Sequence, residues 1–453
     1  MNIRPFLLYG LLLVCCRAIA QEKTDNLLSA LLRKQASPAL LMVLEHPDSF
    51  RYQLIYTRID RDKDNRPHFQ NYYYRVNSRE YFNPASTVKL PLALLALEKM
   101  DSLGRYGVDK ETPMYTDSAY SGQTTAYADS SANDGVPSLA QYIRKIFLVS
   151  DNDAYNRLYE FLGQAAINRR LWQLGYPDIR ITRRFVPMTE EENRHTNPIR
   201  FVRGGGGAGA RDSGDGGRAG ARAGDRGRVD GTGATGWTGV TLYRQPPAYS
   251  ALSFDFSRKV LIGNAYYDRH DSLVHDPMDF TRHNNFPLED AQRILQSVLF
   301  PGSVPGTRRF RLSAADYRFL YKYMSEYPRE SAYPHFDTAV YFDSYTKFFL
   351  FKAGRTPVPS YIRIFNKPGW SYGFLTDIAY VVDFKNKVEF MLTGTIYVNS
   401  DGILNDDKYE YDETGYPFFK EVGNIIYRYE LERPRKYRPD LSRFVLTYGP
   451  MDY

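Results

Sequence analysis

The chain has 453 residues, of which 43% are hydrophobic and 25% are charged, and its formal net charge is +7. This composition is typical of a folded globular protein and excludes a wholly disordered chain, a collagen and a polytopic membrane protein. The mild positive charge favours acidic partners such as cell-wall polymer or anionic lipid, but by itself it does not indicate nucleic-acid binding.

The first 20 residues have the pattern of a secretory signal peptide. Arg4 precedes an apolar run over residues 6–14, and the small-x-small sequence 18–20 predicts cleavage before Gln21. The run is shorter than the roughly 20 apolar residues that a spanning helix needs, so we expect no membrane span. The sequence therefore predicts a secreted or periplasmic protein with one domain over residues 21–453.

A lipoprotein signal at Cys15 or Cys16 is the less favoured alternative, because Val14 is large where such signals usually carry a small residue. Cleavage after Ala20 removes both cysteines of the chain. The exported protein then has no disulfide and no cysteine-ligated metal, and its stability must come from its core.

The rest of the chain predicts strands at both ends with helices between them. Aromatic and branched residues indicate strands over 51–60 and 68–76, and again over 361–366, 374–384 and 388–399. Helical patterns cover residues 86–100, 138–147, 153–162, 288–299, 314–324 and 417–430. We expect an α/β (α+β) fold in which a central antiparallel sheet, built from both termini, carries helices on both faces.

Residues 204–239 interrupt this pattern. The segment holds 15 of the 33 glycines and almost no apolar side chains, so it is predicted to be a disordered insertion. Its GxGxxG sequence has no strand before it and no helix after it, which argues against a dinucleotide site. Its arginines are nearly matched by aspartates, which favours a linker over an RNA-binding segment.

Several sequences compete as the catalytic centre. Residues 369–373 match the G-x-S-x-G nucleophile elbow, but a strand is predicted after Ser371 and no histidine follows it, so this interpretation fails. The pattern S-x-x-K occurs twice, at Ser86–Lys89 and at Ser344–Lys347. Ser344 lies in an aromatic stretch, which is typical of a core.

Ser86 has a different context. Asn83 and Pro84 predict a helix start, so Ser86 and Lys89 lie three residues apart on one face of the first turn. Lys89 could take the proton of Ser86 if its pKa falls from about 10.4 towards neutrality. A second cation close to Lys89 would lower that pKa, so the hypothesis requires another lysine nearby.

Two later sequences complete a pattern. Ser150-Asp151-Asn152 lies between two predicted helices, and Lys367-Pro368-Gly369 follows a predicted strand. In this order, STVK, SDN and KPG resemble the three motifs of serine β-lactamases and penicillin-binding proteins, and most closely those of class A β-lactamases. The resemblance extends over residues 27–429, apart from the glycine-rich segment and residues 240–310.

The resemblance implies a role for each motif residue. Ser86 is the nucleophile, Lys89 its general base, and Ser150 relays a proton to the leaving nitrogen. Lys367 binds a substrate carboxylate and lowers the pKa values of its neighbours. Asn152, Gly369 and Trp370 belong to the implied substrate-binding residues, with the backbone N–H groups of Ser86 and Trp370 as the oxyanion hole. Asp151 is expected to be structural.

The chain departs from the class A pattern in two places. Pro368 stands where that family carries a hydroxyl residue that helps to hold the substrate carboxylate. The family also activates the deacylating water with a Glu that has an Asn four residues later, and no glutamate near residue 190 has one. Glu190, Glu191 and Glu192 are the candidates for this base, although three consecutive acidic residues are also typical of a solvated helix start.

These features predict a serine hydrolase that is acylated at Ser86 by a β-lactam or by a D-alanyl peptide of peptidoglycan and is then hydrolysed. The alternatives are a DD-peptidase and a sensor that stays acylated; a carboxylate close to Ser86 favours the lactamase, and its absence favours the alternatives. We expect no cofactor, no metal and no nucleic-acid partner, and the oligomeric state stays open. A divalent metal at His270, Asp271, His275, Asp276, Asp279 and His283 is less favoured than a polar loop.

Overall fold

The computed structural model describes residues 22–203 and 239–449. The predicted signal peptide lies outside these residues, as do residues 204–238 of the predicted insertion. Both therefore stay predictions.

The centre of the fold is a five-stranded antiparallel sheet built from the two ends of the chain. Its strand order is β10-β11-β12-β1-β2. The strands are β1 (Gln53–Arg61), β2 (Pro67–Tyr74), β10 (Ile362–Ser371), β11 (Phe374–Asp383) and β12 (Val388–Tyr397). This arrangement confirms the predicted fold class.

Both faces of the sheet are covered at its centre, so apolar side chains point to both sides of β11 and β12, although each strand also buries a few polar or charged residues. All ten residues of β11 and of β12 are buried. Along β11, Leu375, Ala379 and Val381 face one core, whereas Ile378 and Tyr380 face the other. Successive side chains of a strand point to opposite faces, so each strand contributes to both cores.

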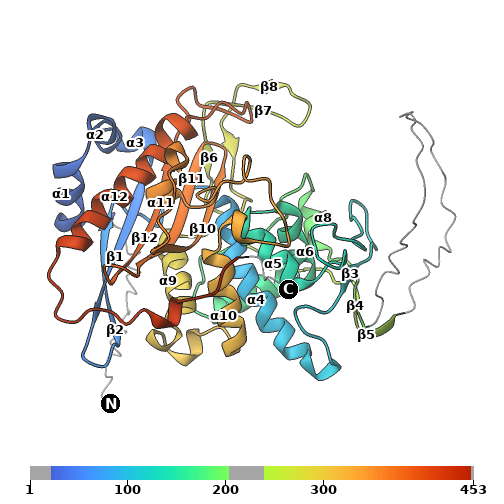
Figure 1. Cartoon of the computed structure of the whole chain (residues 1–453). Coiled ribbons are helices and arrows are strands. Elements are labelled where there is room, and N and C mark those ends of the chain that lie inside the picture. The colour runs from blue at the N-terminus through green and yellow to red at the C-terminus, as the bar shows by residue number, and fades with distance from the viewer. Residues whose placement is uncertain (1–21, 204–238, 450–453) are drawn as a thin grey trace, which may run out of the picture.

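The helices divide between these two cores, as Figure 1 shows. The first core takes its helical residues from α1 (Asn26–Gln35), α2 (Pro38–Glu45), α11 (Phe348–Phe351) and α12 (Tyr416–Glu432). The second takes them from α4 (Lys89–Leu103), α5 (Leu139–Leu148), α6 (Asn152–Leu162), α7 (Gln164–Gln173), α9 (Leu288–Leu299) and α10 (Ala314–Ser325). The short helix α3 (Pro47–Phe50) packs Phe50 against the first core, whereas α8 (Glu190–Arg194) contributes to neither core.

Three small sheets lie outside the central one. They are β3-β4-β5, β13-β7-β8 and β6-β9. Their strands are β3 (Met114–Thr116), β4 (Ile199–Arg203), β5 (Val240–Gln245), β6 (Leu261–Ile262), β7 (Ala265–Tyr267), β8 (Leu273–Val274), β9 (Met278–Asp279) and β13 (Ile403–Leu404). Arg203 pairs with Val240, so the glycine-rich segment joins two neighbouring antiparallel strands.

Most predicted elements are present with small shifts at their ends. The structure also contains helices and short strands outside the predicted ranges. The predicted helix over 86–100 begins as a 3-10 turn, η1 (Ala85–Val88), and continues as α4. The predicted strand 361–366 extends to Ser371 and so contains the KPG sequence. No helix within the two described ranges is long and apolar enough to cross a membrane.

Candidate active site

Ser86 lies in the 3-10 turn at the start of α4, at the boundary between the sheet and the helices. The turn begins one residue later than the sequence predicts, with Pro84 in the cap position and no side-chain cap, and the side chain of Asn83 instead accepts a hydrogen bond from the backbone N–H of Ala85 at 3.0 Å. Ser86 is partly exposed, whereas Thr87 and Lys89 are buried. The turn therefore presents the Ser86 hydroxyl and keeps the adjacent amine away from water.

Lys89 connects the first two motifs. Its ammonium nitrogen donates to Ser86 Oγ at 2.9 Å and to Asn152 Oδ1 at 2.7 Å. It also donates to the backbone carbonyl of Ser150 and lies 3.3 Å from Ser150 Oγ. Sequence-distant segments thus bring two hydroxyl groups and one amide to a single amine.

The SDN sequence forms the start of α6. Asp151 is the N-cap, and its carboxylate accepts from the backbone N–H of Ala154 at 2.7 Å, which agrees with the structural role expected for it. Ser150 has a φ of +63°, a backbone conformation that is costly for a residue with a side chain. This conformation turns the buried hydroxyl of Ser150 towards both lysines.

Lys367 reaches the site from β10, the edge strand of the sheet. Its ammonium nitrogen donates to Ser150 Oγ at 2.9 Å and to the carbonyl of Pro368 at 2.7 Å. A proline is tolerated here because an edge strand leaves one row of backbone groups unpaired. Ser150 therefore lies between the two lysines and accepts from both.

Gly369 allows β10 to lie directly against the turn that carries Ser86. A Cβ atom on Gly369 would lie 2.6 Å from the backbone nitrogen of Ser86 and 2.9 Å from the carbonyl oxygen of Pro84. Real Cβ atoms do not come this close to backbone atoms, so only glycine fits. The third motif is thus in contact with the first, and the backbone of the next residue, Trp370, lies beside it on the same strand.

Burial changes the protonation chemistry of both lysines. Removal from water lowers the pKa of Lys89 from 10.5 to about 7, although the nearby carboxylate of Asp151 acts in the opposite direction. Burial also lowers the pKa of Lys367 far below its ordinary value, and the adjacent Lys89 lowers it further. A neutral amine is therefore accessible beside Ser86 near neutral pH, as the sequence-based hypothesis required.

The three candidate glutamates lie in α8, where they make other contacts. Glu190 pairs with Arg194 and Arg282, at 3.2 and 2.6 Å. Glu191 is 54% exposed and pairs with His195. Glu192 accepts from the backbone and hydroxyl of Thr189, as part of a capping box. The structure thus brings none of these carboxylates into hydrogen-bond contact with Ser86 or Lys89.

An aromatic ring lies next to the Lys89 amine. The centroid of Phe185 is 5.2 Å from Lys89 Nζ, and the ring stacks on Tyr155 at 4.3 Å. The backbone N–H of Phe185 donates to the side chain of Asn156 at 2.8 Å, which fixes this part of the chain against α6. Within residues 22–203 and 239–449, no carboxylate oxygen lies within 4 Å of Lys89 Nζ.

The competing serines have no such partners. Ser371 ends β10 and is followed by a turn into β11, so it does not lie between a strand and a helix. Its hydroxyl accepts from Asn83 at 2.9 Å. Ser344 Oγ is buried without a hydrogen-bond partner, and Lys347 bonds instead to the carbonyl of Met324 and to Asn366.

The polar residues between 270 and 283 make separate contacts. Asp279 accepts from the backbone of Thr281, and His283 contacts Arg183 at 2.8 Å. In the described part of the chain, no group of three or more His, Cys, Asp or Glu side chains is arranged to hold a metal ion.

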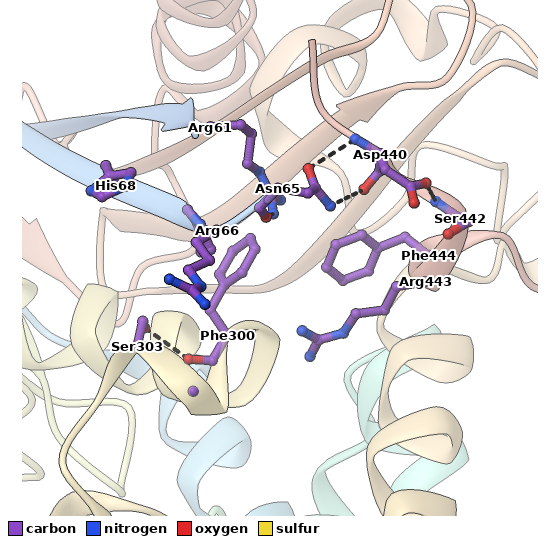
Figure 2. A pocket seen from close by; sticks show the side chains of 12 residues that line it. Arg61, Asn65, Arg66, His68, Phe300, Ser303, Asp440, Ser442, Arg443 and Phe444 are labelled. Carbon is purple, nitrogen blue, oxygen red and sulfur yellow. Dashed lines mark hydrogen bonds between the residues drawn. The ribbon is translucent and has the colours of Figure 1, made fainter. Parts of the chain in front are cut away.

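A cavity of about 630 Å³ lies elsewhere, between the β1–β2 hairpin and the C-terminal segment (Figure 2). Phe300 and Phe444 line it, and Arg66 and Arg443 lie at its side (Figure 2). Its Ser303 hydroxyl donates to the carbonyl of Phe300 at 2.7 Å. None of the seven catalytic and substrate-binding candidates lines this cavity, so it is separate from the Ser86 site.

Sequence reasoning did not identify Phe185 as a neighbour of Lys89, and it placed Lys347 in an ordinary aromatic core. A phenylalanine in a loop carries no pattern that distinguishes it from a core residue. The second S-x-x-K sequence was the only signal for Lys347, and its serine and lysine are joined by a backbone hydrogen bond but not through their side chains.

Comparison with known proteins agrees with the motif pattern. Residues 67–203 match the model of the beta-lactamase enzyme family. This segment holds Ser86, Lys89, Ser150 and Asn152, but not Lys367. The match confirms the resemblance to β-lactamase-type serine hydrolases that the motifs indicated. No curated protein matches the chain.

Solved β-lactamase structures resemble the chain at low sequence identity. A β-lactamase from Sphaerobacter thermophilus is 13% identical, with 88% of this chain and 98% of that chain covered and a TM-score of 0.44. A β-lactamase from Xanthomonas campestris is 15% identical, with 90% and 98% covered and a TM-score of 0.44. An ancestral class A β-lactamase is 16% identical, with 86% and 98% covered and a TM-score of 0.42.

Proposed function

We propose that this protein is an exported β-lactamase-like serine hydrolase in which a β-lactam or a D-alanyl peptide acylates Ser86. The observation that carries the proposal is the 2.9 Å contact between Ser86 Oγ and the buried amine of Lys89, whose pKa is lowered to about 7. A base is most effective when its pKa lies near the working pH.

In the proposed acylation, Ser86 Oγ attacks the carbonyl carbon of the substrate while neutral Lys89 accepts the hydroxyl proton. The oxyanion of the tetrahedral intermediate is held by the backbone N–H groups of Ser86 and Trp370. Collapse of the intermediate breaks the C–N bond, and the proton passes from Lys89 through Ser150 to the leaving nitrogen. Lys367 attracts the substrate carboxylate, and Asn152 binds the substrate amide.

Hydrolysis of the acyl-enzyme requires a base for the attacking water, and this step separates the candidate functions. Phe185 rather than a carboxylate lies next to Lys89. This observation favours slow deacylation, and hence a DD-peptidase or a sensor that stays acylated, over a rapidly hydrolysing lactamase. We therefore propose that acylation of Ser86 is fast relative to hydrolysis of the product.

The test exposes the purified protein to a fluorescent penicillin and to a chromogenic cephalosporin. We expect a stable label on the parent protein, no label on Ser86→Ala, and an unchanged label on Ser371→Ala, the serine of the G-x-S-x-G sequence. Cephalosporin turnover that Ser86→Ala abolishes supports the lactamase instead. Labelling that persists in Ser86→Ala, with peptide mapping to another residue, overturns the proposal.

A further inference from the structure

The second S-x-x-K sequence places a buried lysine behind the strand that carries Lys367. Lys347 is 1% exposed, and its ammonium nitrogen donates to the carbonyl of Met324 at 2.8 Å and to Asn366 Oδ1 at 2.7 Å. No carboxylate within the described residues forms an ion pair with it. A buried lysine held only by neutral oxygens lowers the stability of the fold, so we expect it to have a role that offsets this cost.

Asn366 links Lys347 to the buried carboxylate of Asp377. Its side-chain amide donates to Asp377 Oδ1 at 2.8 Å and to the carbonyl of Thr346 at 2.6 Å. The other oxygen of Asp377 accepts from the backbone N–H groups of Phe348, at 3.2 Å, and Phe349. The segment that follows Lys347 is thus tied to β10 and β11 through side chains that all lie away from water.

This network lies on the face of the sheet opposite to Ser150. Side chains alternate along β10, so Asn366 and Trp370 face the core of α11 and α12, whereas Lys367 and Gly369 face the core of α4. The segment that begins at Lys347 also contacts Trp370, because the ring of Phe348 lies 5.7 Å from it. The same segment therefore supports β10 at both ends of the KPG sequence.

We propose that Lys347 is a positioning residue that, through Asn366 and Asp377, holds Lys367, Gly369 and Trp370 in register against Ser86. The inference rests on the proposed acylation at Ser86. The need for such support follows from the geometry, because Gly369 lies so close to the Ser86 nitrogen that a small shift of β10 opens or blocks the site.

The network also acts electrostatically. The charged groups that face Lys367 are Lys89 from α4, Asp377 from β11 and Lys347, of which the two lysines lower its pKa and the aspartate raises it. Lys347 itself faces Asp377, Arg363 of β10 and Glu330. Burial lowers the pKa of Lys347 to about 7 and raises that of Asp377 to about 6, so above neutral pH Asp377 keeps its charge while Lys347 is largely neutral. Removing the Asp377 charge should therefore lower the pKa of Lys367 further.

The experiment measures the second-order rate constant for labelling by the fluorescent penicillin, from pH 5 to 10, with Lys347→Met and Asp377→Asn. Lys99→Met is the matched control, because Lys99 is also a largely buried lysine of lowered pKa but contacts Phe161 and Gln245. We expect the Lys347→Met constant to fall by roughly 10- to 100-fold, since small misplacements of reacting groups have effects of this size. Labelling should also fall at high pH, where Lys367 loses its proton, and this alkaline limb should move to lower pH in Asp377→Asn.

Thermal unfolding of each variant separates positioning from loss of fold. If Lys347→Met does not fold, the test rests on Asp377→Asn, which keeps the shape of its side chain. Its alkaline limb of labelling must then move to lower pH. An unchanged alkaline limb in Asp377→Asn, or a rate loss in Lys347→Met no larger than that of Lys99→Met, overturns the inference while Ser86 is still labelled. Absence of the label from parent Ser86 overturns the proposed function instead.

Discussion

The reactivity of Ser86 depends on whether the amine of Lys89 carries a proton. Above a pH of about 7, Lys89 is neutral and can accept the proton of Ser86, whereas below it the ammonium form cannot. We therefore expect the rate of labelling to rise by about tenfold per pH unit up to the pKa of Lys89 and then to level off, before loss of the Lys367 proton lowers the rate at higher pH. Stopped-flow labelling across pH 5 to 9 measures this profile.

Replacing Lys89 with arginine tests whether Lys89 acts as the general base. A guanidinium keeps the positive charge but does not lose its proton at these pH values. Labelling of Lys89→Arg should fall by about 10² to 10⁴-fold, the usual contribution of a general base. A variant that folds and still labels at the parent rate would remove Lys89 from the role of base.

A substitution at Phe185 is expected to add a base for hydrolysis of the acyl-enzyme. The substitution Phe185→Glu places a carboxylate in the neighbourhood of Lys89 Nζ, where the ring now lies. We expect the label to be released from Ser86 at least about tenfold faster, because a general base contributes factors of this size or larger. The new negative charge should also raise the pKa of Lys89 and move the acid limb of acylation to higher pH.

Phe185→Gln is the matched control, since it also loses the stacking on Tyr155 but adds no base. Both variants should lose thermal stability to a similar degree. The rate of label release is followed after removal of free penicillin. Equal release from the Glu and Gln variants would show that something other than a missing carboxylate limits deacylation.

At the scale of elements, the contact between β10 and η1 decides whether the site assembles. A methyl group on Gly369 cannot be accommodated against the backbone of Ser86 and Pro84, so Gly369→Ala must push the strand and the turn apart. We expect labelling to fall by roughly 100-fold or more, as reacting groups lose their alignment.

Gly306→Ala is the control for this substitution, because nothing lies within 4 Å of a Cβ at Gly306. Neither glycine has a positive φ, so the two variants differ in space rather than in backbone strain. Gly306→Ala should label like the parent. Labelling of Gly369→Ala at that same rate would mean that β10 does not lie against Ser86 as described.

At the scale of the whole molecule, the glycine-rich segment joins strands that already pair with each other. Arg203 and Val240 are partners in the ladder of β4 and β5, so a short turn can connect them. Replacing residues 204–239 with a four-residue turn should preserve the fold and the labelling of Ser86. Because loop closure costs about 0.6 kcal/mol per doubling of length, we expect a gain of about 2 kcal/mol at most in the free energy of unfolding.

Denaturant unfolding of this deletion variant and of the parent measures the difference. A large loss of stability, or loss of the label from a variant that still folds, would give residues 204–239 a role that their composition does not predict.

The sequence alone determined the sheet and the order of the motifs. Strands rich in aromatic and branched residues at both ends, with helices between them, predict one sheet with helices on both faces, because such layers bury the apolar surface of both elements. Asn83 and Pro84 predicted the helix start near Ser86 to within one residue, and the structural role expected for Asp151 agrees with its cap of α6, because helix starts depend on local interactions.

Only the tertiary structure decided which groups meet. The distances from Lys89 to Ser150 and from Lys367 to Ser150, the place of Phe185 beside Lys89 and the contact of Lys347 with Asn366 all join segments far apart in the chain. The depressed pKa values of the lysines follow from burial, which depends on the packing of α4, α6 and β10 together. Local sequence fixes a cap or a turn, but the environment of a buried charge is set by the residues that fold around it.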